Sequence, residues 1–226
     1  MVKTPWLIRK VFSNRTWKIP TREKILYLTF DDGPHPTATP FVLEQLEKFN
    51  AKATFFCLGK NVTAHPTIYS RILNNDHAVG NHSFNHLNGW KVKDKDYFDD
   101  IIAARKYIDS LLFRPPYGRI TSFQARELSR PPIGFKIVMW DVLSKDYNVN
   151  LSGEDCAFNV IRHSEEGSIV VFHDSEKALP RMQRALTSTL QYFSDKGWRF
   201  EAIRVENANG EEKNRIDDGE KKFGPG

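Results

Sequence analysis

Two adjacent carboxylates, Asp31 and Asp32, end a short apolar run in this 226-residue chain. The run covers residues 25–30, and Gly33 and Pro34 follow the carboxylates directly. An apolar run of this length, bounded by a turn signal, predicts a buried strand. Because adjacent residues of an extended chain point to opposite faces, the two carboxylates can serve different roles. A turn that is merely rich in Asp, Gly and Pro is the alternative that this stretch alone leaves open.

Two histidines, His82 and His86, also follow an expected strand end, after residues 77–80. If this stretch forms a helical turn, residues four apart lie on one face, at a spacing that a single divalent ion can bridge. Two exposed histidines on a helix are the alternative. Together with Asp32, however, the pair would make one carboxylate and two imidazoles. This is the ligand set of a catalytic metal site that keeps positions for water and substrate.

Strand and helix patterns alternate along the rest of the chain. Strands are expected at 25–30, 53–58, 77–80, 135–140, 168–172 and 199–205, and helices at 39–50, 66–73, 96–112, 121–128, 155–163 and 178–193. The prolines within 113–118 exclude a helix there. The alternation predicts an α/β class with a largely parallel sheet, in which chemistry lies at the carboxyl ends of the strands.

Composition limits the remaining function classes. The chain is 40% hydrophobic and carries a formal net charge of +5. Since it has no motif for stacking on bases or reading a groove, no nucleic-acid partner is expected. No apolar run approaches the ~20 residues of a membrane span, so no transmembrane segment is expected either. The sequence shows no signal peptide, which predicts a cytoplasmic location and leaves export by another route open. The oligomeric state is not predicted.

Five short motifs occur in order along the chain, at 29–34, 82–86, 114–118, 146–147 and 170–173. Together they resemble the motifs of the polysaccharide deacetylase family, which shares the NodB homology domain and forms carbohydrate esterase family 4. The resemblance covers roughly residues 25 to 205. The family usually has Trp where this chain has Tyr147, and Leu where it has Val171. Both differences concern the pocket that receives the acetyl group, and therefore bear on substrate choice.

The resemblance implies a fold, a cofactor and a reaction. The fold is a distorted (β/α) barrel with fewer than eight complete units. The cofactor is a divalent metal, with zinc expected and cobalt or nickel as alternatives, held by Asp32, His82 and His86. The reaction is hydrolysis of the N-acetyl group of N-acetylglucosamine units in an N-acetylated glycan or oligosaccharide. A NodB-like domain is therefore expected over 25–205, after a basic N-terminal segment over 1–24 that packs on or leads into the barrel. A polar, mobile tail is expected over 206–226.

The resemblance also implies a general base and its support. Asp31 would be the base, kept ionised by the metal and by Arg114, which can hold a carboxylate through a planar, bidentate pair. The prolines at 115–116 stiffen the backbone, so the amide N–H of Tyr117 would be preset toward the oxyanion. The alternative is that Arg114 simply pairs with a surface carboxylate.

The general acid in this scheme is His173. Asp146 would hold its imidazole and raise its pKa, which keeps it charged near neutral pH. Two alternatives stay open: Asp146 is an ordinary turn residue, or Asp141 is the partner of Arg114 or His173. The substrate-binding candidates are Tyr117, Tyr147, Trp140 and Val171. Trp90 is a further aromatic face for a sugar ring, and core packing is the alternative for Trp140.

Two other functions remain alternatives. The same site could act on a small acylated amine or a cyclic amide, which the missing export signal favours. A non-catalytic glycan-binding module is the second alternative. It predicts a damaged catalytic set, whereas Asp31, Arg114 and His173 are all present.

Overall fold

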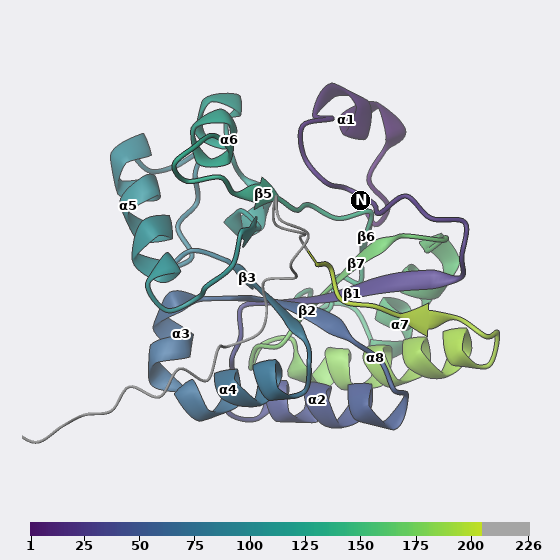
Figure 1. Cartoon of the computed structure of the whole chain (residues 1–226). Helices are drawn as coiled ribbons and strands as arrows, with labels where there is room; N and C mark the ends of the chain where they lie inside the picture. The colour runs from purple at the N-terminus through teal and green to yellow at the C-terminus, as the bar shows by residue number, and fades with distance from the viewer. Residues whose placement is uncertain (205–226) are drawn as a thin grey trace, which may run out of the picture.

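A parallel sheet forms the centre of the protein. The computed structural model describes residues 1–204, and the predicted tail at 206–226 lies outside the described residues. The strands follow the order β5-β4-β3-β2-β1-β7-β6, and β8 pairs with β1 (Figure 1). Their bounds are β1 (Ile25–Asp31), β2 (Ala53–Cys57), β3 (Ala78–Asn81), β4 (Leu112–Phe113), β5 (Lys136–Ile137), β6 (Val142–Leu143), β7 (Ile169–His173) and β8 (Arg199–Phe200).

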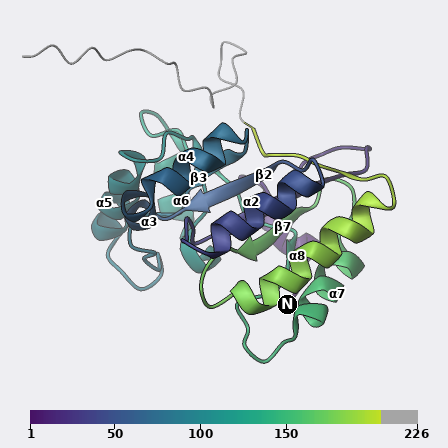
Figure 2. The same ribbon diagram turned by 90° about the horizontal axis from the view of Figure 1, so that it is seen from below.

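Helices cover the outside of this sheet. They are α1 (Trp6–Val11), α2 (Ala38–Lys48), α3 (Gly59–Ala64), α4 (Pro66–Asn74), α5 (Asp94–Arg105), α6 (Ser122–Ser129), α7 (Gly153–His163) and α8 (Leu179–Ser194), with a 3₁₀ turn, η1 (Pro116–Gly118). Seen from below, α8 lies between α2 and α7 under the strands (Figure 2). Within residues 1–204, no helix combines the length and the apolar character needed to cross a bilayer.

The central strand β1 explains why the sheet is parallel and buried. Phe30 pairs in register with Phe55 of β2 and with Phe172 of β7. The three rings stack, with centroids 5.1 Å and 5.9 Å from that of Phe30. Both faces of β1 are covered, so its sequence is a continuous apolar run instead of an alternating one. This packing brings the end of β1, Asp31, beside His173 at the end of β7.

The sheet curls because β5 and β6 form its two edges and are joined by only four residues, 138–141. No helix stands between them, which confirms the predicted distorted (β/α) barrel with fewer than eight complete units. The N-terminal residues run along this join. The amide of Thr16 donates to Ile137 O at 2.8 Å, that of Met139 donates to Thr16 O at 2.7 Å, and that of Thr4 donates to Asp141 O at 2.8 Å. The division into segments 1–24 and 25–205 stays a prediction.

Several expected elements differ from the observed ones. The predicted helix at 96–112 is α5, which ends at Arg105, and Leu112 already belongs to β4. Ile108 and Leu112 are both buried, so a turn followed by a strand satisfies the same apolar spacing. Of the strand predicted at 135–140, only the two residues of β5 are observed as a strand. The predicted strand at 199–205 is β8, which ends at Phe200. The short helices α1 and α3 were not predicted.

Candidate active site

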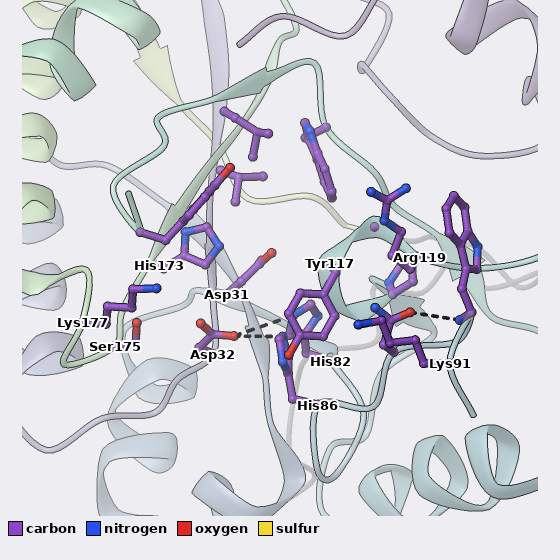
Figure 3. A pocket seen from close by; sticks show the side chains of 18 residues that line it. Asp31, Asp32, His82, His86, Lys91, Tyr117, Arg119, His173, Ser175 and Lys177 are labelled. Carbon is purple, nitrogen blue, oxygen red and sulfur yellow. Dashed lines mark hydrogen bonds and ion pairs between the residues drawn. The ribbon is translucent and has the colours of Figure 1, made fainter. Parts of the chain in front are cut away.

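A cavity of about 1000 Å³ opens at the carboxyl ends of the strands (Figure 3). Most residues singled out from the sequence line it: Asp31, Asp32, His82, His86, Tyr117, Trp140, Tyr147, Val171 and His173. Arg114 and Asp146 lie behind the cavity wall, fully buried, and bond to Asp31 and His173. One cavity therefore brings together side chains from distant parts of the chain.

The donor atoms of Asp32, His82 and His86 lie within 4.8 Å of one another. Asp32 Oδ1 is 3.3 Å from His86 Nε2 and 3.9 Å from His82 Nε2. The Nδ1 of His82 lies 2.8 Å from the carbonyl oxygen of Arg114. A proton on Nδ1 donates to that carbonyl, which leaves Nε2 with a lone pair for a cation. Burial lowers the pKa of His82 to about 3, so this ring is neutral, as a metal ligand must be. The donor set fits one divalent cation.

The two histidines are held by a loop and not by the helical turn that their spacing suggested. No helix is assigned to residues 82–86, and Ser83 and His86 have positive φ angles of 68° and 64°. The amide of Ser83 donates to Asn81 Oδ1 at 2.7 Å, and the amide of His86 donates to Ser83 Oγ at 2.9 Å. The prediction of a shared helical face was therefore wrong, although the two rings still converge, with centroids 5.1 Å apart.

Asp100, on α5, secures the same loop and was missed in the sequence. Its Oδ2 accepts the amides of Phe84 and Asn85, both at 3.0 Å, and its Oδ1 accepts Asn85 Nδ2 at 2.7 Å. A buried carboxylate with three donors fixes a loop that has no regular structure of its own. An Asp in the middle of an acidic helix gives no sequence signal for this role.

Arg114 is fully buried, at 0% exposure, and holds Asp31 through one contact. Its Nη1 donates to Asp31 Oδ1 and to Thr29 Oγ1, each at 2.7 Å. Its Nε donates to Val138 O at 3.2 Å and its Nη2 to Met139 O at 2.9 Å. The bidentate pair expected from the sequence is therefore wrong, because backbone carbonyls of the join between β5 and β6 take the other N–H groups.

His173 and Asp146 form the second charged pair. His173 Nδ1 lies 2.7 Å from Asp146 Oδ1, and the backbone N–H of His173 donates to Asp146 Oδ2 at 2.7 Å. Burial alone would lower the pKa of His173, but the charge and hydrogen bond of Asp146 outweigh it and raise the pKa to about 9. Asp141, the open alternative, instead contacts Lys3, Arg9 and Ser168.

Tyr117 lies in η1 with a positive φ of 58°, and its side chain is 60% exposed. Within residues 1–204, no backbone or side-chain acceptor receives its N–H. Its ring meets His86 edge to face at 4.4 Å between centroids. Gly118 has φ 66°, and a Cβ there would lie 2.5 Å from the Trp140 ring. Glycine is therefore needed at 118 for a left-handed backbone and for a tight contact with Trp140.

The remaining predicted residues shape the wall between these groups. The Tyr147 ring meets the His173 ring edge to face, with centroids 5.2 Å apart. Val171 is buried and still reaches the cavity. Trp140 both lines the cavity and packs against the core, so its core packing is confirmed and its role in substrate binding stays a prediction. The sequence missed several lining residues, namely Asn88, Lys91, Arg119, Leu143, Ser175 and Lys177.

Asp174 was also missed. It follows His173, is fully buried, and accepts the amide of Gly33 at 3.0 Å and the hydroxyl of Thr39 at 2.5 Å. Burial raises its pKa to about 8. Asp174 thereby ties the turn after Asp32 to the end of β7.

Comparison with known proteins places this arrangement among known folds. The sequence model of a family described as "Polysaccharide deacetylase" matches residues 18–130. A peptidoglycan-N-acetylglucosamine deacetylase of Bacillus cereus is 33% identical over 195 residues, which are 83% of this chain and 90% of that protein. A chitooligosaccharide deacetylase of Azorhizobium caulinodans is 31% identical over 164 residues, 70% of this chain and 77% of that protein.

Solved structures show the same fold. The crystal structure of the Bc1960 peptidoglycan N-acetylglucosamine deacetylase, in complex with a naphthalenyl N-oxidanyl-benzamide, superposes with a TM-score of 0.80 at 31% identity. The match covers 88% of this chain and 95% of that one.

Proposed function

Because the chain belongs to the polysaccharide deacetylase family, we propose that it is a metal-dependent hydrolase acting on N-acetylglucosamine units of a glycan or oligosaccharide. It would remove their N-acetyl groups. The observation that carries this proposal is the cavity that holds three converging ligand atoms together with Asp31 and His173. Amide hydrolysis needs an activated water, stabilisation of the oxyanion and a proton for the amine. This cavity offers a group for each.

Asp32, His82 and His86 would hold the cation, and we propose zinc, with cobalt or nickel as alternatives. Two imidazoles and one carboxylate leave an open position, as in catalytic zinc sites. When bound, the cation would polarise the acetyl carbonyl and lower the pKa of a water.

Asp31 would be the general base. Its Oδ1 accepts from Arg114, and within residues 1–204 its Oδ2 accepts from no donor. Oδ2 is therefore free to take the proton of the attacking water. Arg114 fixes the orientation of this carboxylate, since three hydrogen bonds to other groups and the face of Phe56, at 4.0 Å, hold the guanidinium in place.

His173 would be the general acid. Its Nδ1 is engaged by Asp146, so the protonated ring carries its other proton on Nε2. That proton would pass to the nitrogen of the breaking amide bond, and the free amine would leave. The unused N–H of Tyr117 would donate to the oxyanion, a contact that contributes about 3 kcal/mol in other acyl-transfer enzymes.

Tyr147, Trp140 and Val171 would bind the substrate around the acetyl group. Aromatic faces suit sugar rings, and Val171 presents an apolar surface suited to a methyl group. A cavity of about 1000 Å³ is larger than a small acylated amine requires, which favours a sugar chain over that alternative. The expected cytoplasmic location stays a prediction, which fractionation of cells would test.

An acetate-release assay tests the proposal. Acetylated chitooligosaccharides, peptidoglycan strands and small N-acetylated amines would be offered to metal-free protein and to protein reconstituted with zinc. We expect acetate from the glycans only with the metal. Release from small amides alone would support the alternative substrate. Glycan binding without acetate at saturating zinc would support a binding module.

A further inference from the structure

Three cationic side chains line the cavity outside the group of residues to which the chemistry is assigned: Lys91, Arg119 and Lys177. Asp31 and Asp32 are the only carboxylates among the residues that line it. The centre of the cavity is therefore acidic before a cation binds, while its outer wall is cationic.

Among the described residues, none of these three cations forms an ion pair with a carboxylate. Other cations of the protein do form such pairs: Lys18 contacts Glu165 at 2.9 Å, and Arg184 contacts Glu154 at 3.0 Å. Arg119 instead lies over the Trp90 indole, with its guanidinium carbon 4.2 Å from the ring centroid. A guanidinium packed in this way keeps N–H groups available for a planar acceptor.

The cations lie on opposite sides of the centre. In Figure 3, Lys177 lies on one side of Asp31 and Asp32, and Lys91 and Arg119 lie on the other, beyond Tyr117. Lys177 comes from the loop between β7 and α8, Lys91 from the loop between β3 and α5, and Arg119 directly follows η1. A sugar chain with its reacting unit at the centre would extend past both sides.

The backbone around Arg119 and Lys91 is fixed by hydrogen bonds. The amide of Arg119 donates to Pro116 O at 3.0 Å, and the amide of Trp90 donates to Asn88 Oδ1 at 3.0 Å. Gln124 Nε2, from α6, donates to Gly89 O at 2.8 Å. The cations therefore project from an ordered wall, which lowers the entropic cost of using them in binding.

These charges are not needed to balance the catalytic carboxylates. Arg114 already holds Asp31, and Asp32 belongs to the ligand set for the cation. A ligand that neutralises the wall must bring its own negative charge. A carboxylate on a sugar unit matches a guanidinium fork through two parallel hydrogen bonds.

We propose that the cavity selects an acidic glycan, in which carboxylates on the units flanking the reacting N-acetylglucosamine contact Arg119 and Lys91 on one side and Lys177 on the other. The proposal rests on the proposed function only for the position of the reacting unit. It names residues outside the five motifs as the determinants of substrate charge.

Binding to metal-free protein tests the proposal without turnover. Two acidic glycans serve as probes, one with uronic acids alternating with N-acetylglucosamine and one with lactyl ethers, from peptide-free peptidoglycan strands. Each is compared with its own methyl ester, which removes the charge at the cost of one added methyl group. Since one ion pair at a partly exposed site changes an equilibrium by up to about fivefold, two or three predict roughly tenfold tighter binding of the acid. A preference for one of the two acids identifies the source of the carboxylate.

Charge reversal assigns the effect to residues. We expect the double variant Arg119→Glu/Lys91→Glu to lose the preference for the acid over the ester, and Lys177→Glu to lose part of it. The matched control is Arg22→Glu/Lys136→Glu, which makes the same change in net charge at exposed side chains that do not line the cavity. The control should keep the preference.

Equal dissociation constants for acid and ester would overturn the proposal, and so would an equal loss of preference in the control. Acetate release from neutral chitooligosaccharides is measured separately on the unaltered protein. Acetate release from the two acidic glycans is measured in the same way with zinc added. Absence of acetate from both the acidic and the neutral glycans, with the charge preference intact, would contradict the proposed function and leave the acidic-glycan proposal supported. When acetate release is measured with zinc, kcat/KM should likewise be higher for the acid than for its ester.

Discussion

The centre and the rim of the cavity are built in opposite ways. At the centre, Asp31 and His173 each have a fully buried partner, Arg114 and Asp146, at 2.7 Å. At the rim, Trp90 is 58% exposed, and the exposed Arg119 lies over its ring. Buried charge pairs depend strongly on both members, whereas exposed contacts contribute little each. We therefore expect changes at the centre to affect chemistry steeply, and changes at the rim to adjust which ligand binds.

Asp31→Asn should have the largest effect. The amide has nearly the same shape and can still accept from Arg114, but it cannot take a proton from water. We expect kcat to fall by about 10³-fold, within the range for a lost general base. Asp31 is not among the converging ligand atoms, so zinc content should stay at the level of the unaltered protein.

The control for this variant is Asp32→Asn, which should lose zinc together with activity. Metal content measured on both purified proteins checks the contrast. Substantial turnover by Asp31→Asn would assign the base elsewhere.

Asp146→Asn should have the next largest effect, of about 10²-fold on kcat, and should change the pH dependence. Asp146 raises the pKa of His173 to about 9, above the ordinary value near 6.5. The acid form is therefore present below about pH 9, and activity should fall as the pH rises through that value. Without the carboxylate, the pKa of His173 falls, and the alkaline limb of the kcat profile should move toward lower pH.

The raised pKa of His173 also makes the stability of the fold depend on pH. Since the folded-state pKa of His173 is raised, its protonation stabilises the fold fully below about pH 6.5, and this stabilisation is lost as the pH rises through about 9. Denaturant titrations of the unaltered protein and Asp146→Asn between these pH values measure it. An unchanged alkaline limb would separate His173 from the acid step.

The Gly33→Ala variant tests how tightly the buried Asp174 packs behind the catalytic residues. A Cβ at Gly33 would lie 2.0 Å from Asp174 Oδ2, a buried carboxyl that also holds Thr39. The clash should destabilise the fold by about 2 kcal/mol, the usual size for overpacking at a buried site. Gly134→Ala is the control. It has φ 71° and no atom within 4 Å, so only the backbone cost of about 1 kcal/mol applies. Urea unfolding curves compare the two, and equal losses would show that Asp174 can move aside.

The sequence predicted the centre better than the rim for a physical reason. The ends of β1 and β7 follow apolar runs, and their acidic and imidazole groups occur in a recognisable order. The family resemblance supplied the roles of these groups, which local patterns left open. The rim and the supporting residues carry no such local signal. Asp100 and Asp174 act through contacts with loops and turns from other parts of the fold, and Arg119 is defined by its contact with Trp90.

The same reasoning explains the errors in secondary structure. The spacing of His82 and His86 fits a helical turn, but positive φ at Ser83 and His86 and the carboxylate of Asp100 stabilise a loop instead. Strands of two residues, such as β4 and β6, are set by their neighbours in the sheet and are too short for a periodic pattern. Local periodicity identifies long elements, and tertiary contacts decide the short ones.

Trp90→Ala should have the smallest effect and gives the finest test of the contrast. The variant removes the indole under Arg119, a cation–π contact that contributes about 0.5–1 kcal/mol at exposed sites. The guanidinium then loses its support, and KM for an acidic glycan should rise roughly two- to fivefold while kcat stays the same. Trp140→Ala is the counterpart nearer the centre. It removes the ring that packs on Gly118, beside Tyr117, so it should lower kcat as well. If Trp90→Ala also lowered kcat, the rim would take part in positioning the reacting unit, and the division between centre and rim would have to be redrawn.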